Sequence, residues 1–498
     1  MLRATLARLE MAPKVTHIQD KLLINGKFVP AVSGKTFEVV NPADERVIAN
    51  VAEADKADVD LAVKAARQAF ESFRMTDCSW RRNAMLRLAD ILERNSREMA
   101  ALESLDNGKP YEAAKADVAV SVECFRFCAG LADKVDGCVP PRSGNCLGVV
   151  KRQPIGVCGQ IIPWNFPLLM AAFKLSPALA TGNTVVLKPA EQTPLSALRL
   201  GEMAIEAGYP AGVLNILPGF GATAGAAISR HMDVDKVAFT GSTIVGREVM
   251  RMAAETNLKK VSLELGGKSA LIVCEDADVE AAARVATTGI YLNAGQICTA
   301  SSRIYVHDSV YDEFLVLLRK HAEARRVGPG NNTENNMGPL VSKKQHERVL
   351  AYIEDGVKAG ATVVTGGKRM GHTGYFVQPT IFTDVKEDMR ICKEEIFGPV
   401  TCVMKFKDLD EVVRRANDSI YGLAAGICTR NMDTALRYST YLNAGTVWVN
   451  TWNDFCVTMP FGGFKQSGIG RELGRDAIDL YTETKAIHFA LNGPIVKP

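Results

Sequence analysis

The stretch Val261-Ser-Leu-Glu-Leu-Gly-Gly-Lys-Ser-Ala270 reads as a short strand that runs into a glycine pair. It closes a region of the chain, residues 155–273, in which apolar strand-like runs alternate with helical patterns such as 195–207 and 223–230. The five runs are Val157–Ile162, Thr184–Leu187, Val213–Ile216, Val234–Phe239 and Val261–Leu265. Repeated β–α units predict a parallel, doubly wound sheet, which binds ligands at the carboxyl ends of its strands.

A second alternating region follows, and it predicts a second α/β domain with its boundary near Gly266-Gly267. Its helical patterns lie near Tyr311–Arg325, Lys343–Ala359, Leu409–Asn417 and Asp433–Leu442. Its strand-like runs fall at Thr362–Thr365, Thr401–Lys405 and Thr446–Asn450.

The first 153 residues have a different pattern. Residues 22–42 read as short strands with turns at Asn25-Gly26 and Ser33-Gly34. Helical patterns follow at Lys56–Arg74, Trp80–Asn107 and Tyr111–Val135. The stretch Gly137–Gln153 then indicates a protruding hairpin, which has little core of its own and is a candidate for contacts between subunits.

Length and composition narrow the class of protein. A chain of 498 residues predicts two or three domains, and its net charge of +3, without a dense basic run, does not indicate nucleic acid or an anionic membrane as a partner. The 12 cysteines contain no CxxC pair and favour free thiols in a reducing compartment, without zinc. The uncharged stretch 153–173 holds three prolines, so we expect strand, loop and helix there and no membrane span.

The N-terminal residues 1–14 carry three basic side chains against one acid, with leucines at helical spacing. This pattern resembles a short mitochondrial presequence, although it holds Glu10 and no serine. We therefore expect the mitochondrial matrix, with a frayed basic N-terminus and a cytoplasmic protein as the alternative.

Two side chains near opposite ends of the segment 261–301 could carry covalent chemistry. Cys298 lies in Asn293-Ala-Gly-Gln-Ile-Cys-Thr, a run of small and neutral residues, and Glu264 lies between Leu263 and Leu265, ahead of the glycine pair. A thiolate is a strong nucleophile, and a carboxylate within reach can move protons for it or for a water molecule.

Two other segments could bind a cofactor. Phe239-Thr-Gly-Ser-Thr-Ile-Val-Gly246 follows a strand and opens a helix, where N–H groups could face a phosphate; Gly241 and Ser242 could equally serve only as turn and N-cap. Lys188 and Glu191 follow another strand and could bind ribose hydroxyls, with Glu191 favouring NAD over NADP. A surface ion pair is the alternative for them.

Two segments could complete such a site. Asn165, in Pro163-Trp-Asn-Phe-Pro167, could donate its amide N–H to a developing oxyanion, or could simply hold the turn. Glu395 and Phe397, in Glu394-Glu-Ile-Phe-Gly-Pro399, could hold a ribose and pack on a planar ring, or cap a turn.

These segments, in this order and together with Pro460-Phe-Gly-Gly-Phe-Lys-Gln-Ser-Gly-Ile-Gly-Arg-Glu472, resemble the aldehyde dehydrogenase superfamily over residues 22–488. The resemblance is closest to the NAD-dependent cytosolic and mitochondrial branch. It implies oxidation of free aldehydes to carboxylic acids by NAD. Cys298 would form the thiohemiacetal and thioester, Asn165 would hold the oxyanion, and Glu264 would activate the hydrolytic water.

The resemblance implies further roles. Residues expected to hold NAD are Lys188, Glu191, Ser242, Trp164, Gly241, Gly246, Glu395 and Phe397. An aromatic substrate tunnel would be lined by Phe166, Phe173, Phe455 and Phe461. Glu472 would support the catalytic acid, and Lys268 would position Glu264 or the cofactor; no metal is expected.

The implied fold is a Rossmann-like cofactor domain (22–136 and 155–266), an α/β catalytic domain (267–481), an oligomerisation arm (137–154 and 482–498) and an extension (1–21). A homotetramer is expected, with a dimer as the alternative.

Three rival interpretations of the function are open. The first is a CoA-acylating enzyme, but such enzymes typically lack the acid at the Glu264 position. The second is a thiol hydrolase, which would need a histidine partner for Cys298, and the third is a binding protein on the same fold.

Overall fold

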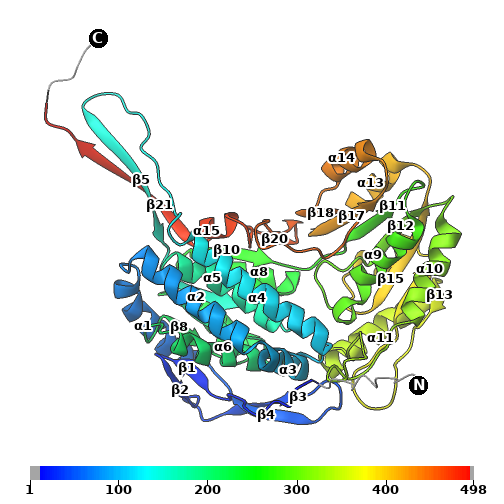
Figure 1. The fold of residues 1–498 in the computed structure, drawn as a ribbon, viewed down its shortest axis with the longest axis horizontal. Coiled ribbons are helices and arrows are strands. Elements are labelled where there is room, and N and C mark those ends of the chain that lie inside the picture. The colour runs from blue at the N-terminus through cyan, green and yellow to red at the C-terminus, as the bar shows by residue number, and fades with distance from the viewer. Residues whose placement is uncertain (1–11, 494–498) are drawn as a thin grey trace, which may run out of the picture.

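The computed structural model describes residues 12–493, which form two α/β lobes and a projecting ribbon (Figure 1). The first lobe contains an eight-stranded sheet in the order β2-β1-β8-β7-β6-β9-β10-β20. The bounds of its strands are β1 Leu22–Ile24, β2 Lys27–Val29, β6 Val157–Ile161, β7 Thr184–Lys188, β8 Leu214–Ile216, β9 Lys236–Thr240, β10 Lys260–Glu264 and β20 Gly468–Ile469.

Strands β6 to β10 are parallel, as their alternation with helices predicted. The chain proceeds from β6 through β7 to β8 in one direction across the sheet, then returns to β9 and β10 on the other side of β6. The strand order therefore reverses between β6 and β9. A crevice at the carboxyl ends of strands on either side of such a reversal is where open α/β sheets bind ligands.

Helices cover the first sheet, and their ends follow capping chemistry. Helix α1 (Lys56–Phe73) begins at Asp55, whose carboxylate accepts from Ala57 N while Asp58 accepts from Asp55 N, a reciprocal capping box. The remaining helices of this lobe are α2 Cys78–Arg94, α3 Ser96–Asn107, α4 Tyr111–Leu131, α5 Pro167–Ala180, α6 Leu195–Glu206, α7 Ala226–Arg230 and α8 Thr243–Ala254.

Two helical predictions in this lobe were wrong in detail. The pattern at 80–107 is two helices, α2 and α3, because Asn95 between them leaves helical geometry and caps α2 by donating from its side chain to Ile91 O. The pattern at 223–230 begins as a π-helical turn at Gly221–Gly225 and becomes α-helical only from Ala226.

The second lobe contains a seven-stranded sheet in the order β13-β14-β15-β12-β11-β17-β18, in which only β13 is antiparallel to its neighbour. Its strands are β11 Ala270–Val273, β12 Arg303–His307, β13 Thr362–Thr365, β14 Thr380–Thr383, β15 Val400–Phe406, β17 Ala424–Cys428 and β18 Thr446–Val449. Its helices are α9 Val279–Tyr291, α10 Tyr311–Glu323, α11 Lys343–Lys358, α12 Arg390–Lys393, α13 Leu409–Asn417 and α14 Met432–Tyr441.

The projecting ribbon corrects the predicted hairpin at 137–153. Its strand β5 (Cys146–Pro154) pairs along its whole length with the C-terminal strand β21 (Thr482–Ala490), and the preceding residues add only an isolated bridge from Cys138 to Val150. The ribbon extends away from both lobes (Figure 1). Its two strands thus come from segments more than 300 residues apart, which local patterning could not reveal.

The chain also returns to the first sheet within the range predicted as catalytic domain. Strand β20 pairs antiparallel with β10, placing Gly468 opposite Glu264 and Ile469 opposite Leu263. Tyr481 belongs to the core of the first lobe, which it shares with Leu187 and Leu198. The division at residue 481 therefore does not follow the sheets. The remaining short elements are β3 Thr36–Val40, β4 Val47–Ala52, β16 Tyr421–Gly422, β19 Phe464–Lys465 and α15 Asp476–Asp479.

Two further findings bear on function. Within residues 12–493, none of the helices combines the length and apolar character needed to cross a bilayer, and no group of three or more His, Cys, Asp or Glu side chains could hold a metal ion. The uncharged stretch 153–173 is a strand, a loop and the first half of α5. The basic segment at 1–14 falls largely on residues 1–11, which lie outside the described part of the chain.

Candidate active site

Cys298 follows a tightly bent loop between α9 and β12. The 3₁₀ turn Leu292–Gly295 holds Asn293 at φ 48° and Ala294 at φ 54°, in the left-handed region that side chains rarely adopt. Gly295 follows at φ 71°, where an added Cβ would overlap the carbonyl oxygen of Gly398. The bend therefore presses the thiol loop against the Glu394–Pro399 segment.

Asn165 lies directly beside this loop. It follows β6 at the point where the strand order reverses, and its side-chain Nδ2 donates to Gln296 O at 2.9 Å. In return, Asn293 Nδ2 donates to Asn165 O at 2.9 Å. An amide nitrogen has two N–H donors, so one remains for an oxygen bound beside Cys298.

The glycine pair after β10 brings three of the predicted segments together. A Cβ on Gly267 would overlap the carbonyl oxygen of Cys298, and one on Gly266 would overlap the Glu395 carboxylate. Gly267 N also donates to Glu395 Oε1 at 2.9 Å. Only residues without side chains permit this approach, so the strand end, the thiol loop and the Glu395 loop meet at backbone distance.

Glu264 ends β10 and is 6% exposed. Its Oε2 atom has no hydrogen-bond partner among residues 12–493, and a Cβ on Gly462 would stand 2.7 Å from its Oε1. Burial raises the pKa of Glu264 well above its usual range, and the nearby Glu472 carboxylate raises it further. A carboxyl group with a raised pKa and a free oxygen is suited to accept a proton.

Glu472 lies in the same buried region, as expected for a supporting acid. It forms an ion pair with Lys174 of α5, and both side chains are almost fully buried. The Lys174 charge lowers the pKa of Glu264, against the larger effects of burial and of Glu472. The two acids and the lysine thus form one electrostatic cluster beneath the strand end.

The surroundings of Cys298 do not favour its thiolate. Its side chain is partly exposed and packs against the hydrophobic core of the first lobe. Burial raises the pKa of the thiol, and the Glu395 and Glu264 carboxylates raise it further. Activation of this thiol therefore requires a proton acceptor or a bound positive charge.

The predicted cofactor residues lie along the carboxyl ends of the first sheet. Lys188, buried at the end of β7, donates to Pro189 O at 2.9 Å and Gly219 O at 2.6 Å, and burial lowers its pKa. The Glu191 side chain is 29% exposed; its Oε2 lies 3.7 Å from Lys188 Nζ, and its Oε1 accepts from Gln192 Nε2 at 3.1 Å. Carboxylate lone pairs remain to accept from hydroxyl groups.

The glycine-rich segment after β9 has a structural role as well. Ser242 caps α8 by accepting from Val245 N, and Gly241 N donates to Glu264 O at 3.0 Å. A Cβ on Gly246 would stand 2.6 Å from the Leu265 side chain, so this glycine lets α8 pack on the strand end. The N-terminus of α8 therefore faces the crevice at the sheet reversal.

Trp164 and Phe397 meet across the two lobes. Their ring centroids lie 5.2 Å apart and the rings are perpendicular. Phe397 is held at φ 62°, and Gln345 Nε2 of α11 donates to its carbonyl oxygen at 2.8 Å. Arg348 of the same helix donates to Glu395 O at 2.9 Å, so α11 fixes the whole Glu395–Phe397 loop.

The four phenylalanines predicted to line a tunnel occupy different environments. Phe455 and Phe461 stack edge to face at 5.3 Å, and Phe455 also meets Trp448. Phe166 is half-buried. Phe173 is 3% exposed in the core cluster against which Cys298 packs. Phe461 belongs to the same cluster as Phe173, whereas Phe166 packs against the core of the second lobe.

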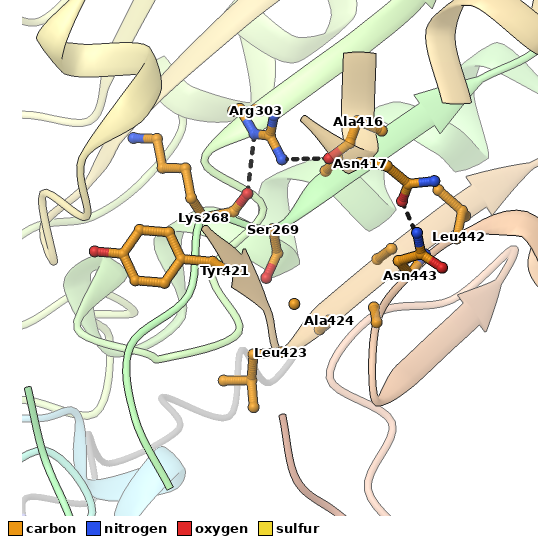
Figure 2. Close-up of a pocket in the computed structure, with 14 residues that line it drawn as sticks. Lys268, Ser269, Arg303, Ala416, Asn417, Tyr421, Leu423, Ala424, Leu442 and Asn443 are labelled. Atoms are coloured by element: carbon orange, nitrogen blue, oxygen red, sulfur yellow. Dashed lines mark hydrogen bonds between the residues drawn. The ribbon is translucent and has the colours of Figure 1, made fainter. Parts of the chain in front are cut away.

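Lys268 is directed away from Glu264. Its ammonium donates to Ile391 O at 2.7 Å, and Arg303 fixes its carbonyl oxygen. Figure 2 shows both residues at a small pocket, together with Ser269, whose hydroxyl has no hydrogen-bond partner in the part of the chain that the structure describes. Cys298, Glu264 and Asn165 do not line this pocket, so it is separate from the candidate site. Positioning of Glu264 by Lys268 has no support in these contacts.

Sequence reasoning missed several residues that hold the site together. They are Asn107 and Lys109, which donate to the carbonyl groups of the Asn165 loop, Asn293 and Gln296 of the thiol loop, and Lys174. Asn293 and Gln296 lie within five residues of Cys298, so their position in the sequence could have suggested a role in the site. Asn107, Lys109 and Lys174 come from distant segments, and no local sequence pattern indicates that they reach the site.

The sequence over residues 28–487 matches the aldehyde dehydrogenase family. The chain belongs to this family. The segments that meet at Gly266-Gly267, namely the end of β10, the Cys298 loop and the Glu395 loop, are among the motifs on which the resemblance to this family rested.

Relatives of this aldehyde dehydrogenase chain include proteins of known name and structure. It is 86% identical over 499 residues, all of both chains, to "Aldehyde dehydrogenase, mitochondrial" of Leishmania tarentolae. It is 53% identical to "Benzaldehyde dehydrogenase, mitochondrial" of Antirrhinum majus, covering 97% of this chain and 91% of that protein. An NAD+ complex of aldehyde dehydrogenase from Bacillus cereus has 53% identity and a TM-score of 0.94, covering 95% of this chain and 97% of that one.

The electrostatics of Cys298 lead to a prediction for its reactivity. Because the Glu395 carboxylate raises the pKa of the thiol, Glu395→Gln should increase its thiolate fraction at pH 8.5. Burial raises the pKa of Glu395 to about 7, so its carboxylate is largely charged at that pH. We expect iodoacetamide to alkylate Cys298 about twofold to tenfold faster in this variant, measured by mass spectrometry of the modified peptide.

The adjacent Glu394→Gln is the matched control. Glu394 is exposed and bonds to Tyr352 and Arg390, so its removal should leave the alkylation rate unchanged. An unchanged or slower rate in Glu395→Gln would mean that its carboxylate does not act on the thiol.

Proposed function

We propose that this chain oxidises free aldehydes to carboxylic acids with NAD, through a covalent intermediate on Cys298 that water hydrolyses. The observation that carries the proposal is the meeting of a thiol, an amide donor and a buried acid around one glycine pair: Cys298, Asn165 and Glu264. Family membership and the NAD+ complex of the Bacillus cereus relative support aldehyde oxidation by this cofactor.

In the first half-reaction, the Cys298 thiol releases its proton to solvent, and its sulfur attacks the aldehyde carbon to form a thiohemiacetal. The carbonyl oxygen becomes an oxyanion, which the free N–H of the Asn165 amide and the Cys298 backbone N–H stabilise. Donors that are already fixed in place contribute most to such stabilisation, and Asn165 is fixed by its bond to Gln296 O. Collapse of the oxyanion expels a hydride and leaves a thioester on Cys298.

NAD supplies the hydride acceptor when it is bound. The residues present fit NAD. The partly exposed Glu191 carboxylate can accept from ribose hydroxyls, and Glu395 can hold a second ribose. Gly241 and Ser242 precede the N-terminus of α8, where backbone N–H groups can bind a phosphate. Trp164 and Phe397 border the same region, and Gly246 lets α8 approach the sheet. The acidic Glu191 would repel a 2′-phosphate, which favours NAD over NADP.

In the second half-reaction, Glu264 removes a proton from the water that attacks the thioester. Its raised pKa makes it a sufficiently strong base, and its unpartnered Oε2 is available to that water. Glu472 lies close enough to influence the proton affinity of Glu264. Hydrolysis releases the carboxylic acid and returns Cys298 to its thiol form.

The aromatic surroundings of Cys298 favour uncharged aliphatic or aromatic aldehydes, with Phe166, Phe173, Phe455 and Phe461 as the proposed tunnel.

The first sheet would be the cofactor domain, the second the catalytic domain, and the β5–β21 ribbon the oligomerisation arm. We expect a homotetramer. Removal of residues 482–498 should yield smaller particles by light scattering, and an unchanged mass would exclude the arm.

The compartment proposed is the mitochondrial matrix. The relative from Leishmania tarentolae, 86% identical over the full chain, is named mitochondrial, and the basic leucine-spaced segment at 1–14 agrees with it. Identical distributions of the full chain and a chain lacking residues 1–14 would exclude that segment as an import signal.

The nucleophile gives the direct test. Cys298→Ala lacks the sulfur that forms the covalent intermediate, so NADH production from propanal should fall at least about a thousandfold. Absorbance at the NADH band measures it. Cys78→Ala is the matched control, because this partly exposed thiol lies at the start of α2 and belongs to none of the proposed site segments. Substantial NADH production by Cys298→Ala would refute the proposal.

The base gives a second, more specific test. Glu264→Gln keeps the shape of the side chain but cannot accept a proton, so a first turnover of NADH should form while steady turnover falls by about 10²–10⁴. An acyl adduct should then accumulate on the Cys298 peptide, seen by mass spectrometry. The exposed Glu275→Gln serves as control. Slow turnover without a trapped adduct would assign Glu264 to the first half-reaction instead.

A further inference from the structure

Lys109 is a buried lysine whose ammonium group points at the loop that carries Asn165. It follows α3 after Gly108 and is 2% exposed. Its Nζ donates to Asn165 O at 3.0 Å and lies 4.2 Å from the centre of the Phe166 ring. One side chain thus contacts both the proposed oxyanion residue and a proposed tunnel residue.

Two buried carboxylates hold this ammonium in place. Asp117 of α4 accepts from Lys109 Nζ at 2.5 Å, and Glu103 of α3 lies 3.7 Å from it. Burial raises the pKa of both acids, and the lysine charge opposes that rise. Placing three ionisable groups in the interior is costly, and a buried charge is retained only where it is paired and hydrogen-bonded.

The carbonyl oxygen of Asn165 receives three side-chain donors. Besides Lys109, these are Asn293 Nδ2 at 2.9 Å and Asn107 Nδ2 at 3.4 Å. The peptide plane that follows Asn165 is therefore fixed from both lobes, since Asn293 belongs to the thiol loop. Of the three donors only Lys109 carries a charge, and charged donors make the stronger bonds.

We propose that Lys109 is a positioning residue for the oxyanion site. Its bond to Asn165 O fixes the backbone of that residue, so that the side-chain amide faces the Cys298 loop, and its contact with Phe166 fixes the adjacent tunnel wall. The inference rests on the proposed function, because it assigns a role within the first half-reaction. Lys109 itself touches neither the thiol nor the substrate.

This role differs from simple support of the fold in what it should affect. A misplaced Asn165 amide weakens stabilisation of the oxyanion, so the step that forms the thioester should slow. Removal of a single oxyanion donor commonly lowers a rate by 10²–10³, and a displaced donor should have a smaller effect. Hydrolysis of the thioester passes through an oxyanion at the same position and should slow as well, whereas binding of NAD does not use the Asn165 amide and should not change.

The test uses the full chain with NAD and propanal. Because Lys109→Met alone leaves two acids facing an apolar side chain, the principal variant is Lys109→Met/Asp117→Asn, which removes the ammonium and its closest partner together. We expect the rate constant of the first-turnover NADH burst to fall about tenfold to a hundredfold. Hydrolysis of the preformed acyl-enzyme, which forms an oxyanion at the same position, should also slow, whereas the NAD dissociation constant should stay within about twofold.

A double-mutant cycle tests whether Lys109 acts through Asn165. Adding Lys109→Met/Asp117→Asn to Asn165→Ala should slow the burst less than about twofold further, because the donor that Lys109 positions is already absent. Lys109→Arg should recover part of the loss, since it restores the positive charge. Lys115→Met is the control for removal of a lysine from the same region, and its burst should match wild type within twofold.

Three results would overturn the inference: a wild-type burst in the principal variant, an NAD dissociation constant that rises as much as the burst rate falls, or full additivity with Asn165→Ala. These are distinguishable from failure of the proposed function. If wild type produces no NADH from aldehydes, or if Cys298→Ala does, the activity itself is wrongly assigned.

Discussion

The close backbone approach at Gly266-Gly267 is the constraint on which the site depends. At this point the last parallel strand of the first sheet ends, and the chain enters the second lobe through β11. The Cys298 carbonyl and the Glu395 carboxylate occupy the space where side chains would otherwise lie. A side chain at Gly266 or Gly267 would therefore push the Cys298 loop or the Glu395 loop away from the strand that carries Glu264.

The sequence allowed prediction of what depends on local pattern. The parallel strands, most helices of the second lobe and the segments near Cys298, Glu264 and Asn165 follow from periodicity and from residue chemistry. Long-range pairing could not be predicted in the same way: β21 joins β5, and β20 joins β10. The burial of Lys109 could not be predicted for a similar reason, because nothing in the sequence around a single lysine indicates that it will be buried.

Acidic groups dominate the interior around the thiol. Glu264, Glu395 and Glu472 lie there with Lys174 as the nearby buried cation, and burial raises the pKa of the first two. The resting site thus keeps its thiol protonated and its base ready to accept protons. A cationic ring bound between Trp164 and the thiol would favour the opposite charge state of sulfur, which links reactivity to cofactor binding.

The position of β20 and β21 near the C-terminus has a consequence for biosynthesis. Each completes a structure that begins far upstream: one covers the free edge of β10, and the other supplies the partner of β5. During translation, these edges stay unpaired until the segments from Gly468 onward have left the ribosome. Until then the nascent chain exposes two strand edges on which other chains could pair.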